Sequence, residues 1–155
     1  MDKPKVLLFD IDNTLLDFSA GARQGMEEIF REAGLPYRPE MFAVFQAEND
    51  KLWARIERGE LTIAGLRDVR WQTILARLGL EGDGAAMEDA FRVRLHESAV
   101  PVAGAVDVLG RLRGAYRLCA ASNGPYAQQV NRLRRAGMLD AFERLFISGQ
   151  MGAEK

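Results

Sequence analysis

Hydrophobic and polar residues change their spacing twice along the chain. Residues 6–9, VLLF, form a continuous apolar run before Asp10, which predicts a short strand buried on both faces of a parallel sheet. From Ser19 onward, apolar residues recur every three or four positions, as in amphipathic helices that bury one face. The stretches that this spacing predicts to be helical are 19–33, 39–59, 62–79 and 86–96.

The second change comes after Pro101, where short helical and strand-like stretches alternate. A short helix at 103–114 precedes a strand at 116–122, and a helix at 126–137 precedes a strand at 145–148. This alternation is typical of right-handed βαβ units in a parallel sheet. We therefore predict an α/β core formed by residues 1–16 and 100–155, with residues 17–99 inserted as an all-helical cap.

Composition narrows the function classes. The 155 residues carry a net charge of -1, which argues against a protein that binds nucleic acid through bulk electrostatics. No apolar run reaches the ~20 residues of a membrane span, and a cytoplasmic protein is expected. Cys119 is the only cysteine and His96 the only histidine, so one chain cannot form a clustered His/Cys zinc site. Cys119 is expected in the core and His96 at a solvated or capping position.

Asp10 and Asp12 are the first candidates for chemistry. Side chains at i and i+2 share a face of an extended chain, so both carboxylates can converge on one substrate. Two carboxylates at such a short distance repel each other, so the site needs a cation, or else one of them stays protonated. Hard oxygen ligands at the end of a strand suit Mg²⁺. One carboxylate can attack phosphorus while its neighbour transfers protons. The same Asp-x-Asp-Asn stretch could instead be an ordinary turn.

The segments FDIDNTL and AASNG, with Lys155, together resemble the motifs of the haloacid dehalogenase superfamily. This resemblance implies a Rossmann-like, three-layer parallel sheet with a helical cap. It also implies an Mg²⁺-dependent phosphatase, because dehalogenases proper lack the second aspartate. In that enzyme Asp10 is the nucleophile and Asp12 the general acid/base. Ser122, Asn123 and Lys155 bind the phosphoryl group, and Mg²⁺ is held by Asp10 and the main-chain carbonyl of Asp12.

A narrower resemblance lies in the helical block. LLDF, followed by PEMFAVFQAENDKLWARIERGELT, is similar to the pyrimidine 5′-nucleotidases, which implies a nucleoside 5′-monophosphate as substrate. Phe18 follows the first motif and is a candidate for substrate contact. Trp53 could stack on a base, but it lies on an apolar helical stripe, which favours a packing role. A sugar-phosphate phosphatase or phosphomutase of the same superfamily is the nearest alternative.

The superfamily has a fourth motif, an acidic pair that supplies a further Mg²⁺ ligand, and no counterpart follows Lys155. We therefore expect that the sequence is a fragment and that the sheet is incomplete at its C-terminal end. A non-catalytic, phosphate-binding domain is the alternative from another class. The first strand would then have an unpaired edge, through which two copies of the chain could dimerise.

Overall fold

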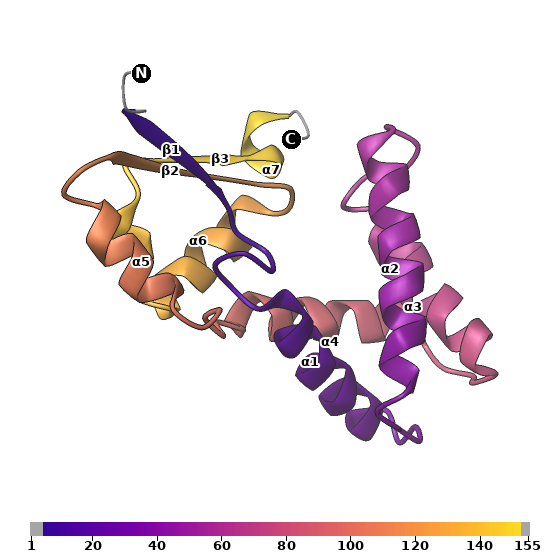
Figure 1. Ribbon diagram of the computed structural model, residues 1–155. Coiled ribbons are helices and arrows are strands. Elements are labelled where there is room, and N and C mark those ends of the chain that lie inside the picture. Colours follow the sequence, from indigo (N-terminus) through magenta and orange to yellow (C-terminus); the bar gives the residue numbers. More distant parts are fainter. Residues whose placement is uncertain (1–4, 153–155) are drawn as a thin grey trace. The chain divides into compact units, whose positions relative to one another are not determined.

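The computed structural model describes residues 5–152 and divides into two compact units (Figure 1). The two ends of the chain, up to Gly21 and from His96, form an α/β unit, and Ala22–Leu95 form a helical unit. No helix among the described residues is both long and apolar enough to cross a membrane. The boundaries that we predicted for a cap, 17 and 99, stay a proposal.

The α/β unit contains a three-stranded parallel sheet in the order β1-β2-β3. Its strands are β1 (Val6–Asp10), β2 (Arg117–Ser122) and β3 (Arg144–Ile147). Its helices are α5 (Ala105–Leu112), α6 (Tyr126–Arg135), the 3₁₀ helix η1 (Leu139–Ala141) and the single turn α7 (Ser148–Met151). The alternation of strands and helices confirms the predicted α/β class.

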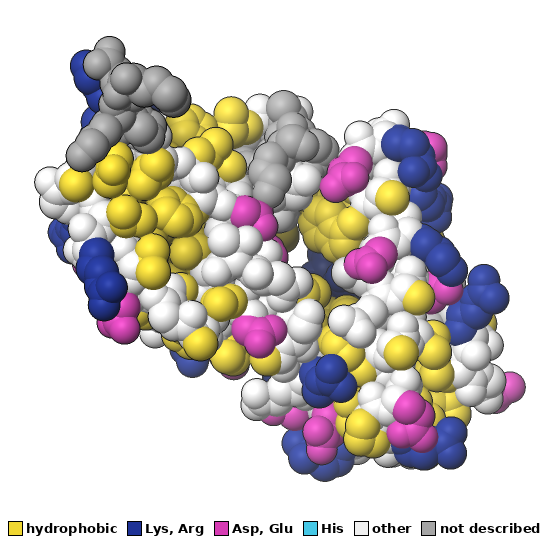
Figure 2. Space-filling model, in the orientation of Figure 1, with side chains coloured by type: hydrophobic (Ala, Val, Ile, Leu, Met, Phe, Trp, Pro, Cys, Tyr) yellow, Lys and Arg dark blue, Asp and Glu magenta, His cyan; other side chains and the backbone are white. Residues whose placement is uncertain are grey.

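One face of the sheet carries the core of this unit. Helices α5 and α6 lie on the same side of the sheet (Figure 1), and their apolar side chains pack with alternate residues of the strands. The prediction that β1 is buried on both faces is wrong for the described residues, because Val6 is 45% exposed and Leu8 is 62% exposed. The side chains of Leu7 and Phe9 point the other way and pack against the core. Apolar side chains accordingly gather on the surface of this unit in Figure 2.

The helical unit is built from α1 (Phe18–Glu32), α2 (Met41–Glu57), α3 (Leu66–Leu78) and α4 (Gly84–Glu97), of which α1 begins and α4 ends in the α/β unit. Its core is an aromatic cluster in which the rings of Phe45 and Trp71 stack and Phe91 meets both edge-on. The third helix begins four residues later than predicted. The Thr62 hydroxyl caps a turn by accepting the N–H of Gly65, and the helix follows that turn.

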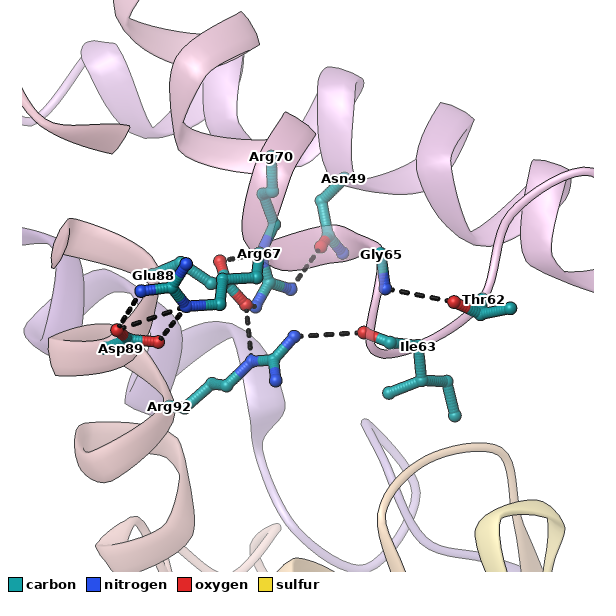
Figure 3. Close-up of polar contacts among 9 residues, drawn as sticks. All are labelled: Asn49, Thr62, Ile63, Gly65, Arg67, Arg70, Glu88, Asp89 and Arg92. Atoms are coloured by element: carbon teal, nitrogen blue, oxygen red, sulfur yellow. Dashed lines mark hydrogen bonds and ion pairs between the residues drawn. The ribbon is translucent and has the colours of Figure 1, made fainter. Parts of the chain in front are cut away.

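A buried polar network also lies in the helical unit (Figure 3); we call Asn49, Arg70, Glu88 and Arg92 the Arg70 cluster. Arg70 forms two hydrogen bonds with Glu88, at 2.6 and 2.9 Å, and a third with Asn49 Oδ1 at 3.1 Å. Arg92 donates to Glu88 at 2.8 Å and to the carbonyl oxygen of Ile63 at 2.9 Å. The cluster therefore joins α2, α3 and α4 to the loop between α2 and α3.

Candidate active site

The carboxyl ends of the three parallel strands meet at one edge of the sheet. Asp10 ends β1 opposite Ala121, and Ser122 ends β2 opposite Ile147, the last residue of β3. Ligands of open α/β sheets bind at this edge, in the crevice beyond the strand ends. The fold therefore brings Asp10 and Ser122 to the edge at which the sequence predicted a site.

A tight turn fixes the residues between β1 and α1. The carbonyl oxygen of Ile11 accepts the N–H groups of Thr14, Leu15 and Leu16, at 2.9 to 3.3 Å. Asn13 occupies the left-handed region with φ of 58°, which asparagine tolerates better than most residues. The side-chain oxygen of Asn13 accepts the N–H of Ser19 at 3.2 Å, so it also satisfies a donor in the first turn of α1.

Within this turn the two aspartates have different surroundings. Asp10 and Asp12 are each half-buried. The hydroxyl of Thr14 donates to Asp10 Oδ2 at 3.3 Å. Asp12 instead forms an ion pair with Arg132 of α6, whose Nη1 lies 2.5 Å from Asp12 Oδ1. The repulsion expected between the two aspartates is therefore offset, for Asp12, by a cation of the same chain.

Gln129 completes the contacts of Asp12. Its Nε2 donates to Asp12 Oδ2 at 2.8 Å and to Ser122 Oγ at 2.6 Å, while its Oε1 accepts from Arg132 Nη1 at 2.8 Å. Only one orientation of the amide matches these partners, because the carboxylate can only accept and the guanidinium can only donate. We call Asp12, Ser122, Gln129 and Arg132 the Asp12 cluster.

Gln129 and Arg132 were not predicted as site residues from the sequence. Both are about 99% buried, together with Leu133, on the inner face of α6. Residues at i, i+3 and i+4 share a helix face, so the spacing puts an amide and a guanidinium among apolar neighbours. Buried polar side chains are informative because most such residues lie in solvent. The run RLRR made Arg132 look like one more surface arginine, which concealed this signal.

Ser122 is buried, with 2% of its surface exposed, and its hydroxyl has two hydrogen-bond partners. It accepts from Gln129 and donates to the carbonyl oxygen of Asn123 at 3.2 Å. The next loop is tied to the start of α7, where Gly124 N donates to Ser148 Oγ and Gly149 N donates to Gly124 O, each at 3.0 Å. This contact joins the ends of β2 and β3.

The other predicted site residues have separate positions. Phe18, the first residue of α1, is half-buried, and the guanidinium of Arg132 lies 6.0 Å from the centroid of its ring. Trp53 belongs to the helical unit, where it is half-buried and packs against Leu52, Ile56 and Leu66. Lys155 lies outside the described residues.

The donor set at the strand end can be compared with the needs of Mg²⁺. No group of three or more His, Cys, Asp or Glu side chains gathers anywhere in residues 5–152. Asp10 offers a carboxylate whose Oδ2 accepts from Thr14, and both carboxylate oxygens of Asp12 accept hydrogen bonds within the Asp12 cluster. The main-chain carbonyl of Asp12 is then its available donor. Two hard oxygen donors suit an ion that retains several waters and binds phosphate.

Comparison with known families assigns the chain to a family of hydrolases. A model of the haloacid dehalogenase-like hydrolases matches residues 4–155, and the chain belongs to that family. This finding confirms the resemblance of its motifs and the Rossmann-like class of its fold.

Named relatives agree with the narrower resemblance. The chain is 32% identical to the HAD-hydrolase YfnB of Bacillus subtilis over 155 residues, which are 100% of this chain and 66% of YfnB. It is 31% identical to the pyrimidine 5′-nucleotidase PynA of Streptococcus pneumoniae and 32% identical to the pyrimidine 5′-nucleotidase YjjG of Escherichia coli, with 97% and 96% of this chain aligned. The chain spans 64% of the length of each nucleotidase.

Two solved structures have a fold similar to that of this chain. A crystal structure of YfnB bound to magnesium, which reveals interdomain movement, matches 99% of this chain and 69% of that chain, with a TM-score of 0.93 and 31% identity. The L-2-haloacid dehalogenase of Xanthobacter autotrophicus matches 99% of this chain and 60% of that chain, with a TM-score of 0.74 and 22% identity. The second likeness shows the shared fold alone.

Proposed function

We propose that the protein is an Mg²⁺-dependent phosphomonoester hydrolase that acts on nucleoside 5′-monophosphates through an aspartyl-phosphate intermediate. The observation that carries this proposal is that two aspartates in one turn have different surroundings. Asp10 stands at the end of β1, and Asp12 is held by hydrogen bonds within the Asp12 cluster. Two carboxylates with different partners in one turn suit two different tasks in phosphoryl transfer.

The proposed reaction has two steps. A carboxylate oxygen of Asp10 attacks phosphorus, the bond from phosphorus to the ester oxygen breaks, and the departing oxygen takes a proton from Asp12. In the second step Asp12 takes a proton from a water molecule, which attacks the same phosphorus and releases Asp10 and inorganic phosphate. Asp12 thus returns to its starting state, and the net reaction consumes one water molecule.

Phosphate binding is assigned to Ser122, Asn123 and Lys155. Ser122 supports this role by its position at the end of β2, one residue after Ala121, the partner of Asp10 in the sheet. Its hydroxyl would exchange the carbonyl oxygen of Asn123 for a phosphoryl oxygen, because a hydroxyl donor rotates freely. For Asn123 and Lys155 the roles rest on the family motifs.

Mg²⁺ would be held by the Asp10 carboxylate and the Asp12 main-chain carbonyl. When bound, the ion would offset the negative charge of the carboxylate and the phosphoryl oxygens as they approach each other. The YfnB structure bound to magnesium, at 31% identity, supports this choice of metal.

The nucleotide substrate is proposed from the two nucleotidases among the relatives. The test measures phosphate release by the full-length protein over a panel of pyrimidine and purine 5′-monophosphates and sugar phosphates, with Mg²⁺ and with a chelator. We expect Mg²⁺-dependent release that is fastest with pyrimidine nucleotides. A preference for sugar phosphates would favour the alternative substrate class, and no release from any compound would favour a non-catalytic phosphate-binding domain.

Phe18 and Trp53 are proposed to influence substrate choice. The test compares kcat/KM for a nucleotide with kcat/KM for p-nitrophenyl phosphate in Phe18→Leu and Trp53→Leu. A larger loss on the nucleotide indicates substrate contact, whereas equal losses indicate packing. Equal losses would be explained by the contacts of Trp53 with its apolar neighbours and of Phe18 with Arg132, which the substitutions would remove.

Two further expectations remain proposals. A cytoplasmic location rests on sequence composition. Pairing of two copies through β1 would use the apolar surface that includes Leu8. Light scattering by a polypeptide of residues 1–155 tests the second expectation. Association that increases with concentration, and that a charged residue in place of Leu8 prevents, supports pairing. A polypeptide that stays monomeric at all concentrations contradicts it.

A further inference from the structure

We infer that Arg132 is a positioning residue for proton transfer, which sets the place of the Asp12 carboxylate with the help of Gln129. This inference rests on the proposed function. Arg132 is fully buried, with a side chain 1% exposed, whereas that of Asp12 is 31% exposed. The pair is therefore a buried cation that holds a carboxylate at the boundary with solvent, where a substrate can reach it.

The hydrogen bonds leave Asp12 little freedom. Its Oδ1 accepts from Arg132 and its Oδ2 accepts from Gln129, so rotation of the carboxylate breaks at least one bond to a buried donor. A buried donor left without a partner costs about 1–3 kcal/mol, and more when it is charged. Proton transfer to a departing oxygen needs a donor within hydrogen-bond reach, so fixing the carboxylate serves catalysis directly.

Arg132 is itself fixed from a second side. Its Nε donates to the carbonyl oxygen of Ser98 at 3.2 Å, and its neighbour Asn131 donates to the carbonyl oxygen of His96 at 2.8 Å. Residues 96–98 bring the chain out of α4 and back into the α/β unit. The guanidinium thus has partners in this returning segment, in Gln129 and in Asp12, and its position does not depend on Asp12 alone.

The test uses substrates that differ in their need for a proton. The alkoxide that leaves a nucleoside 5′-monophosphate needs protonation, whereas p-nitrophenolate is stable without it. The quantity measured is kcat/KM, which covers the steps through the first phosphoryl transfer. For Arg132→Met in the full-length protein we expect a loss on uridine 5′-monophosphate of about 10²-fold or more, within the range of general acid catalysis. We expect a loss below about tenfold on p-nitrophenyl phosphate, because that step needs no general acid.

Three further variants separate positioning from general damage. Arg132→Lys, which keeps the charge, should recover part of the loss on the nucleotide. Asp12→Asn should show the same dependence on the leaving group, and adding Arg132→Met to it should cost little more, because residues that act as a unit are not additive. Asn131→Ala is the matched control, since it removes a neighbouring bond to the returning segment and leaves Asp12 untouched.

A measurement without turnover checks the geometry. Crystals of Arg132→Met, grown without Mg²⁺, should show the Asp12 carboxylate displaced or in more than one rotamer. The inference is overturned by equal losses on the two substrates, by additive losses in the double variant, or by an unmoved Asp12. An inactive wild-type protein with an undisplaced Asp12 in the variant would overturn both proposals. An active wild-type protein with equal losses would overturn only the role of Arg132.

Discussion

Arg70 in the helical unit and Arg132 in the α/β unit are both buried arginines bonded to a carboxylate and to an amide side chain, but the carboxylates differ in exposure. Glu88, the partner of Arg70, is fully buried, whereas the side chain of Asp12, the partner of Arg132, is 31% exposed. The Arg70 cluster joins three helices and a loop of one unit. The Asp12 cluster stands at the end of a sheet and leaves part of its carboxylate accessible.

This difference separates a structural role from a chemical one. A sealed ion pair cannot meet a substrate, and the cost of taking both charges out of water makes its net contribution to stability small. Its loss is nevertheless costly, because removing one partner leaves the other buried and unpaired. A pair open on the carboxylate side holds a reactive group in place without hiding it. Exposure of the acidic partner therefore distinguishes two clusters that are similar in composition.

The largest expected effect is the loss of turnover in Asp10→Asn. An amide attacks phosphorus poorly and offers the metal no anion, so phosphate release should fall by about 10³-fold or more, as for other removed nucleophiles. The midpoint of thermal unfolding should stay equal or rise, because one of two neighbouring negative charges is gone. Phosphate-release and thermal-unfolding measurements on the full-length protein test both parts. Near-normal release would rule out Asp10 as the nucleophile.

The next effect concerns stability. Arg70→Met leaves Glu88 buried, with the partly exposed Arg92 as its remaining ionic partner within residues 5–152. The free energy of unfolding should therefore fall by about 3 kcal/mol, as expected when a buried pair is broken. Denaturant unfolding measures this change. The control is Arg67→Met. Arg67 lies one helical turn from Arg70, and its exposed pair with Asp89 should contribute much less to stability. Equal effects of the two variants would contradict the contrast between sealed and exposed pairs.

A smaller effect is expected where the loop after β2 contacts the start of α7. A Cβ added to Gly149 would lie 2.5 Å from the carbonyl oxygen of Gly124, so Gly149→Ala must displace backbone and should cost about 1–3 kcal/mol. Gly110→Ala, in the helix α5, meets nothing within 4 Å and should stabilise slightly. Chemical denaturation of both variants provides the measurement. Unchanged stability of Gly149→Ala would contradict this prediction and would mean that the backbone at Gly124 moves away at little cost.

The smallest effect belongs to the exposed pair of Arg117 and Glu143. Hydrogen bonds from Arg117 lower the pKa of Glu143 below its ordinary value of 4.5. A lowered pKa in the folded state means that the pair stabilises the protein above about pH 4.5, and that this contribution disappears as the pH falls through the folded-state pKa. Glu143→Gln should therefore be slightly less stable than the wild type at pH 7, and the difference should disappear as the pH falls through the folded-state pKa of Glu143. A difference that does not change with pH would assign the effect to packing.

The sequence predicted the strands and most helices because their apolar spacing is regular, and Asp10 and Ser122 were found because they follow apolar strands. It did not predict the late start of α3, since the Thr62 cap closes a local turn instead of a helix. It also did not show that Gln129 and Arg132 reach Asp12, more than 100 positions away, because such contacts depend on how α6 packs against the sheet. The pairing of Asp12 is therefore a property of the tertiary structure.

The turn at Ile11 has a consequence for hydrogen exchange. One carbonyl oxygen receives three amide protons, those of Thr14, Leu15 and Leu16, so these amides cannot exchange with solvent water until the turn opens. Segments between a strand and a helix ordinarily exchange quickly because their amides face water. Here the three amides should instead exchange more slowly than amides that face water, and slowest at the buried Leu15 and Leu16, so the loop that carries Asp12 has a stability of its own that exchange measures residue by residue.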